Sequence, residues 1–205
     1  MLTVIKKKDL RKQQILQAAI DVFGKSNFQS ASISEIAQKA NIAEGTIYQY
    51  FKNKEDLFFS IPAQKTESFC DELDLHIEGI HDAFNKLRKL TWYYLYFFKT
   101  NPDYARILML EMRVNKSFFK SRTFGKVQVF NDKVLEIIKE GQEENFIRND
   151  MKGHVIREVL LGFLEHRVTR WLLKEEKYDL LANYGEIFDL VFNGIKSPNA
   201  ERRHM

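Results

Sequence analysis

The sequence contains few of the residues that interrupt helices or crosslink a chain. Its 205 residues include three prolines, nine glycines and one cysteine. So few prolines and glycines favour long uninterrupted helices. No segment has a pattern more typical of a strand than of a helix, so we expect an all-α fold. The single cysteine, Cys70, excludes an intramolecular disulfide and is typical of a reducing compartment. A redox role for Cys70 is the alternative to simple packing, but the sequence places no basic residue directly beside it that would be expected to lower its pKa.

Long apolar runs and export signals are missing too. The longest apolar run, Trp92–Phe98, is bounded by Lys89 and Lys99 and is far shorter than the roughly 20 residues of a membrane-spanning helix. The apolar residues at the N-terminus precede a lysine run instead of following one, which is unlike a signal peptide. We therefore expect a cytoplasmic protein with no membrane partner.

The signatures of an enzyme or a metal protein are also missing. The histidines show no ligand spacing, since His76 and His81 are five residues apart and point to different helix faces. There is no glycine-rich phosphate loop, nucleophile elbow or acid-rich diphosphate motif. A polar group at Glu165–Arg170 is better explained as a solvated or interface face than as an active site. We expect no catalytic residue, no metal and no cofactor.

The positive charge is concentrated near the N-terminus. Residues 1–60 carry nine basic and six acidic side chains, while the whole chain has a net charge of +4. The run Lys6–Lys12 suits either an arm along a phosphate backbone or a solvated tail.

Apolar spacing and capping residues predict the helices. Ser32 and Glu35 form a capping box, Asn101-Pro102 is typical of a helix start, and Pro62 should kink or split the helix that contains it. The predicted helices are Asp9–Ser26, Ser32–Ala40, Glu44–Tyr50, Lys54–Ile80, Asp82–Lys99, Asp103–Val114, Ser117–Asn145, Met151–Lys174 and Asp179–Ile195.

Two of these helices, Ser32–Ala40 and Glu44–Tyr50, are short and joined by a tight turn, which predicts a helix-turn-helix. The second can enter the major groove of DNA. Gly45 has no Cβ and permits close approach, and Gln49 suits a base edge.

Three segments of this region resemble the TetR/AcrR family of transcriptional regulators: Ile15–Phe23, Ser34–Ala40 and Gly45–Leu57. The resemblance covers roughly residues 11–60. It implies a DNA-binding domain over residues 1–53 and a ligand-binding and dimerisation domain over residues 54–205. It also implies a repressor that binds palindromic operator DNA as a homodimer and is released by a small molecule.

The resemblance implies that Ser34, Thr46, Tyr48, Tyr50 and Lys54 contact DNA. The chemistry and position of Glu44, Gly45 and Gln49 add these three residues to one candidate set of DNA-contacting residues. Ile47 and Phe51 lie on the opposite helix face and should be core.

The sequence departs from the family pattern at four positions. Asn27 and Asn41 replace turn glycines, and asparagine tolerates positive φ. Ala43 replaces the usual capping residue, a loss of about 1 kcal/mol. Glu44 places an acid toward the DNA, which leaves open a helical ligand-binding protein with a vestigial DNA-binding domain.

Aromatic and methionine residues are dense between Phe84 and Phe130, which suits either a plain core or an apolar pocket between helices. The candidate ligand-binding residues are Trp92, Tyr96, Tyr104, Met109, Met112 and Phe130. We expect a mostly apolar effector such as an acyl chain or acyl thioester, with Arg106, Arg113 and Lys116 near an anionic head. The alternative is a cationic aromatic compound, as in efflux regulators; it is disfavoured because Glu111 is the only acid between Asp103 and Asp132.

The last two predicted helices carry apolar residues on more than one face, which suggests a core on one side and a second copy of the chain on the other. The candidate dimer-interface residues are Val159, Phe163, Tyr184, Phe188 and Val191.

Overall fold

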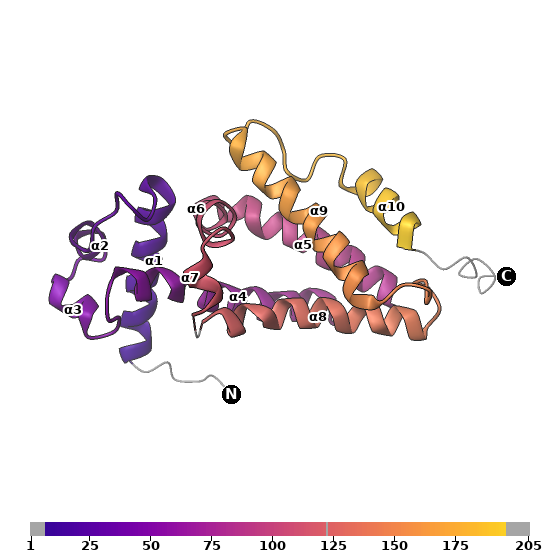
Figure 1. The fold of residues 1–205 in the computed structure, drawn as a ribbon, viewed down its shortest axis with the longest axis horizontal. Coiled ribbons are helices and arrows are strands. Elements are labelled where there is room, and N and C mark those ends of the chain that lie inside the picture. The colour runs from indigo at the N-terminus through magenta and orange to yellow at the C-terminus, as the bar shows by residue number, and fades with distance from the viewer. Residues whose placement is uncertain (1–6, 122, 196–205) are drawn as a thin grey trace. The chain divides into compact units, whose positions relative to one another are not determined.

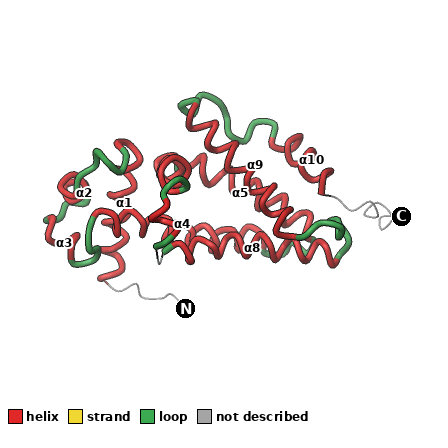
Figure 2. Tube along the Cα trace, in the orientation of Figure 1, coloured by secondary structure: helices red, strands yellow, loops and turns green. Residues whose placement is uncertain are grey.

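A computed structural model describes residues 7–121 and 123–195, and over these residues helices joined by loops and turns are the regular elements (Figures 1 and 2). The helices are α1 (Lys7–Ser26), α2 (Ile33–Lys39), α3 (Glu44–Tyr48), α4 (Lys54–Ile77), α5 (Ala83–Thr100), α6 (Pro102–Arg106), the π-helix η1 (Ile107–Met112), α7 (Lys116–Phe119), α8 (Phe124–Glu143), α9 (Gly153–Leu173) and α10 (Tyr184–Ile195). The all-α prediction is confirmed. None of the described helices is long and apolar enough to cross a membrane.

The chain divides into two compact units, and neither is a single continuous stretch. The first contains residues 1–65 and 101–124, and the second contains residues 66–100 and 125–205. The first unit therefore combines α1–α3 and the start of α4 with α6, η1 and α7. The second unit combines the rest of α4 with α5, α8, α9 and α10.

The core of the first unit forms where the apolar face of α1 meets α2, α3 and α4. Ile15, Phe23, Ile36 and Ile47 are buried, and the Phe23 ring meets the Phe58 ring edge-on at 4.9 Å between centroids. An edge-on arrangement suits aromatic rings because the positive ring edge faces the negative ring face.

Local signals account for the turns of this unit. The Ser32 Oγ accepts a hydrogen bond from the Glu35 N–H at 3.1 Å, and the Glu35 carboxylate accepts one from the Ser32 N–H at 2.7 Å. These two bonds form the predicted capping box. The pKa of Glu35 is lowered because its carboxylate accepts hydrogen bonds from the Ser32 N–H and from the Ser32 hydroxyl. Asn27 and Asn41 adopt φ values of 97° and 52°, so asparagine does occupy left-handed positions here.

The core of the second unit is aromatic. Phe69 of α4 lies 4.9 Å from both Tyr93 and Phe97 of α5 and 5.0 Å from Phe130 of α8, measured between ring centroids. Helix α9 packs on α5, and α10 contacts α5 through Phe188 and Phe192, whose rings meet that of Phe84.

Three predicted helices differ from those observed in continuity, start or helix type, whereas the ends of the others agree to within three residues. Instead of one helix over Ser117–Asn145, α7 ends at Phe119, the Ser121 N–H bonds to the Phe118 carbonyl, and α8 begins at Phe124. Helix α10 begins at Tyr184 and not at Asp179, because Asn183 has a φ of 57°. The predicted α-helix over Asp103–Val114 is α-helical only to Arg106 and then becomes the π-helix.

Two of the prolines, Pro62 and Pro102, lie in helices but at different positions. Pro102 is at the first position of α6, as predicted. Pro62 lies inside α4, which continues from Lys54 to Ile77 without being split.

Candidate functional site

The recognition helix α3 is short and fixed by its buried face. Ile47 on α3 and Phe51 just after it are both buried, as predicted. Ala43 at the N-cap makes no side-chain hydrogen bond. The helix is thus held by apolar contacts on one face, and the opposite face is left for a partner.

Most predicted DNA-contacting residues lie on that open face. Ser34, Glu44, Gly45, Tyr48 and Gln49 are exposed, and Thr46, Tyr50 and Lys54 are half-buried. A Cβ added at Gly45 would meet no atom within 4 Å, so the protein's own packing does not require glycine there. Which of these side chains contact DNA stays a prediction.

Besides its predicted contact with DNA, Lys54 makes contacts within the protein that the sequence did not predict. Its ammonium group donates a 2.9 Å hydrogen bond to the Ala31 carbonyl and lies 4.6 Å from the centroid of the Phe28 ring. Lys54 therefore holds the loop that precedes α2, 23 residues away in sequence. Only the folded chain brings these groups together.

The basic run Lys6–Lys12 lies almost entirely within the first turns of α1. Lys6 lies outside the described residues, while Arg11 bonds to Gln14 and the Lys12 ammonium lies 5.8 Å from the Phe51 ring centroid.

The six candidate ligand-binding residues are divided equally between the two units. Tyr104, Met109 and Met112 are buried in the first unit. In the second unit Trp92 and Phe130 are half-buried and Tyr96 is exposed. Within that unit, Trp92 and Tyr96 stack with ring centroids 5.0 Å apart and nearly parallel planes, while Phe130 belongs to the aromatic core.

The π-helix η1 carries two candidate ligand-binding residues and also contacts the loop between α1 and α2. It contains Met109 and Met112, and its Glu111 carboxylate accepts a 2.8 Å hydrogen bond from the Phe28 N–H, in the loop between α1 and α2. Burial raises the pKa of Glu111. A π-helix is less stable than an α-helix and is frequent at functional sites. A single acid within the apolar run Ile107–Met112 was the available sequence signal for such a buried contact.

The five candidate dimer-interface residues differ in exposure. Val159 is 59% exposed, Phe163 and Val191 are half-buried, and Phe188 is only 5% exposed. Tyr184 donates a hydrogen bond to the Arg88 carbonyl of its own chain. Phe188 is therefore packed in the core of the protomer. The large apolar side chains that are exposed on α9 and α10 are Val155, Val159, Leu173 and Leu190.

Cys70 is buried, and this burial raises its pKa, which favours the packing interpretation. Within residues 7–121 and 123–195, no three His, Cys, Asp or Glu side chains are grouped so that they could hold a metal ion.

Two family models together match almost the whole described chain. Residues 15–61 match the model for bacterial regulatory proteins of the TetR family, and residues 63–194 match the model for the C-terminal region of YsiA-like TetR proteins. The chain belongs to the TetR family of transcriptional regulators. The helix-turn-helix of α2 and α3 is accordingly its DNA-binding element, and the chain is a regulator and not an enzyme.

Several proteins of the TetR family resemble this chain over nearly its full length. The fatty acid metabolism regulator protein of Bacillus subtilis is 27% identical over 191 residues, which cover 93% of this chain and 98% of that protein. The regulator AcrR of Shigella flexneri is 26% identical over 182 residues, covering 82% and 81%.

Two solved structures have the same fold and similar sequences. The fatty acid degradation regulator FadR from Bacillus halodurans superimposes with a TM-score of 0.86 at 28% identity, covering 94% of this chain and all of that one. FadR from Bacillus subtilis, solved in complex with stearoyl-CoA, gives 0.83 at 27% identity, covering 89% and 98%.

Proposed function

We propose that this TetR-family regulator represses transcription from a palindromic operator and is released by a long-chain acyl-CoA. The observation that carries the proposal is the similarity, over nearly the whole chain, to a FadR bound to stearoyl-CoA. The aromatic and methionine content of α5, η1 and α8 supports an apolar effector. We assign DNA binding to residues 1–53 and effector binding and dimerisation to residues 54–205.

The effector prediction is tested on an operator selected from random DNA. Stearoyl-CoA at micromolar concentration should lower operator affinity about 100-fold, which requires roughly 2.7 kcal/mol of coupling between the two sites. Fluorescence anisotropy with labelled operator measures the affinity. Stearate and a cationic dye are the comparison ligands. Release by the dye alone would favour an efflux-type regulator, and a chain that bound no operator would support the vestigial interpretation motivated by Glu44.

The roles of two DNA-binding residues are separable. Gln49→Ala should relax the preference at one base pair and lower affinity for the preferred site by about 1–3 kcal/mol. Lys54→Ala should weaken binding to all sequences and reduce the salt dependence by about one unit of slope. Because Lys54 also bonds to the Ala31 carbonyl, the thermal stability of that variant is measured in parallel. Identical profiles for the two variants across an operator library would contradict the assignment.

We also propose that the regulator is a homodimer through α9 and α10. Val159 and Leu190 support this, because they expose 59% and 76% of their surface on these two helices. Sedimentation at micromolar concentration should give twice the 24.3 kDa chain mass.

A further inference from the structure

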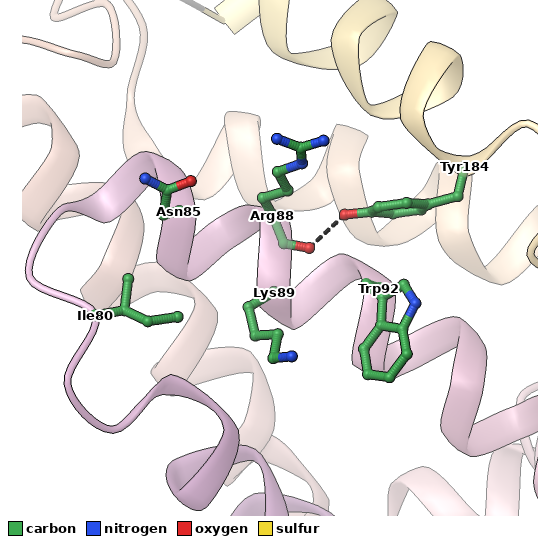
Figure 3. A pocket seen from close by; sticks show the side chains of 6 residues that line it. All are labelled: Ile80, Asn85, Arg88, Lys89, Trp92 and Tyr184. Atoms are coloured by element: carbon green, nitrogen blue, oxygen red, sulfur yellow. Dashed lines mark hydrogen bonds between the residues drawn. The ribbon is translucent and has the colours of Figure 1, made fainter.

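The second compact unit contains a groove that includes one candidate ligand-binding residue, Trp92. It has a volume of about 530 Å³ and is lined by Ile80, Asn85, Arg88, Lys89, Trp92 and Tyr184. Figure 3 shows that these residues come from the α4–α5 turn, from α5 and from the start of α10. Arg88 and Asn85 are exposed and the other four are half-buried, so the groove is open to water.

Two cations of this groove lack an acidic partner. Among the described residues neither Arg88 nor Lys89 forms an ion pair, and the Lys89 ammonium instead lies 4.7 Å from the centroid of the Trp92 ring. Other lysines of the same helix differ, because Lys86 pairs with Glu140 and Lys99 with Asp179. Arg88 extends toward α10 and Lys89 in the opposite direction, beside Trp92 (Figure 3).

The described acidic residues near the groove do not pair with Arg88 or Lys89. The Asp82 carboxylate accepts both a backbone and a side-chain hydrogen bond from Asn85, each 2.9 Å long. Asp189 acts on the Tyr184 hydroxyl through its charge and forms no ion pair with Arg88. The groove thus offers a guanidinium and an ammonium group to an anion.

The two aromatic residues that line the groove, Trp92 and Tyr184, are held in place by contacts with their neighbours. Trp92 is stacked on Tyr96. The Tyr184 hydroxyl donates to the Arg88 carbonyl and shares a 2.9 Å hydrogen bond with the Thr91 hydroxyl. Rigid aromatic surfaces beside two cations suit an organic anion that carries phosphate groups, since guanidinium binds phosphate in a bidentate manner and aromatic faces bind flat rings.

We propose that this groove binds the phosphate-bearing nucleotide head group of the acyl thioester effector. The inference rests on the proposed function and specifies where the charged end of the effector binds. Each CH₂ of an alkyl chain that is removed from water contributes about 0.8 kcal/mol to binding, so the acyl chain requires an enclosed site. Phosphate groups, in contrast, can bind at an open, cationic site. Among the basic residues that the sequence suggested for this role, Arg106 is paired with Asp103 at 2.8 Å.

The test compares three probes on two double variants of the full chain. Arg88→Gln/Lys89→Gln removes the groove cations. Lys126→Gln/Lys139→Gln removes two exposed charges from α8 of the same unit and is the matched control. Calorimetry measures the binding of stearoyl-CoA, coenzyme A and stearate.

The groove variant should bind stearoyl-CoA about tenfold or more weakly, lose most binding of coenzyme A, and bind stearate within about twofold of the wild type. The control variant should match the wild type for all three probes. Equal affinities of the groove variant and the wild type for stearoyl-CoA and coenzyme A would overturn the proposal.

The two proposals fail in different ways. If stearoyl-CoA binds as described but does not release operator DNA, the proposed function fails and the groove assignment stands. If it releases DNA equally well from the wild type and the groove variant, the groove assignment fails and the proposed function stands. If the wild type binds none of the three probes, both fail.

Discussion

Phe188→Asp should destabilise the second compact unit instead of separating a dimer. The Phe188 side chain is 5% exposed, and its ring centroid lies 5.4 Å from that of Phe84 and 5.8 Å from that of Phe192. The substitution removes this packing and places a carboxyl group among aromatic rings, at a cost of about 4 kcal/mol or more. For a chain of this size, we expect the melting temperature to fall by roughly 10 °C. Circular dichroism during heating measures the change.

Leu190→Asp is the matched control for this prediction. Leu190 lies on the same helix two residues later and is 76% exposed. Exposed substitutions usually change the stability of a protomer by less than about 0.5 kcal/mol, so this variant should melt like the wild type at protein concentrations at which both are monomers. If α10 contributes to the dimer interface, the same variant should sediment as a monomer. A normal melting temperature for Phe188→Asp would show that Phe188 is not part of the protomer core.

Gly24→Ala should destabilise the first compact unit, although the same substitution usually stabilises a helix. Alanine exceeds glycine in helix propensity by about 1 kcal/mol. At position 24, however, a Cβ would lie 2.4 Å from the Asp103 Cβ and 2.7 Å from its Cα. Because Asp103 backbone is involved, α1 and α6 must move apart, and overpacking of this kind costs about 1–3 kcal/mol. Urea denaturation should therefore show a lower midpoint than for the wild type.

Gly125→Ala is the control for this prediction, because an added Cβ is expected to fit without a clash. Gly125 lies in the first turn of α8, where an added Cβ meets no atom within 4 Å. Its midpoint should equal or slightly exceed that of the wild type. Gly24→Ala with a raised midpoint would mean that the contact between α1 and Asp103 does not limit the stability of the unit.

The sequence alone determined the helical fold and the DNA-binding element. The signals involved are local: the Ser32–Glu35 capping box, Pro102 at a helix start, and asparagine at two left-handed positions. Each of these features depends on backbone groups only a few residues apart, so it can be predicted from the sequence without knowledge of the tertiary structure. The face of α3 opposite Ile47 was equally predictable, because helical periodicity fixes which side chains share a face.

Only the tertiary structure decided which apolar face is core and which cations are available. Several faces of the last two helices are apolar, and their periodicity does not say that Phe188 meets Phe84, about a hundred residues earlier in the chain. The bond from Lys54 to the Ala31 carbonyl and the pairing of Lys99 with Asp179 depend likewise on how segments pack. Burial and ion pairing are properties of surfaces brought together by folding, and local sequence signals do not encode which surfaces meet.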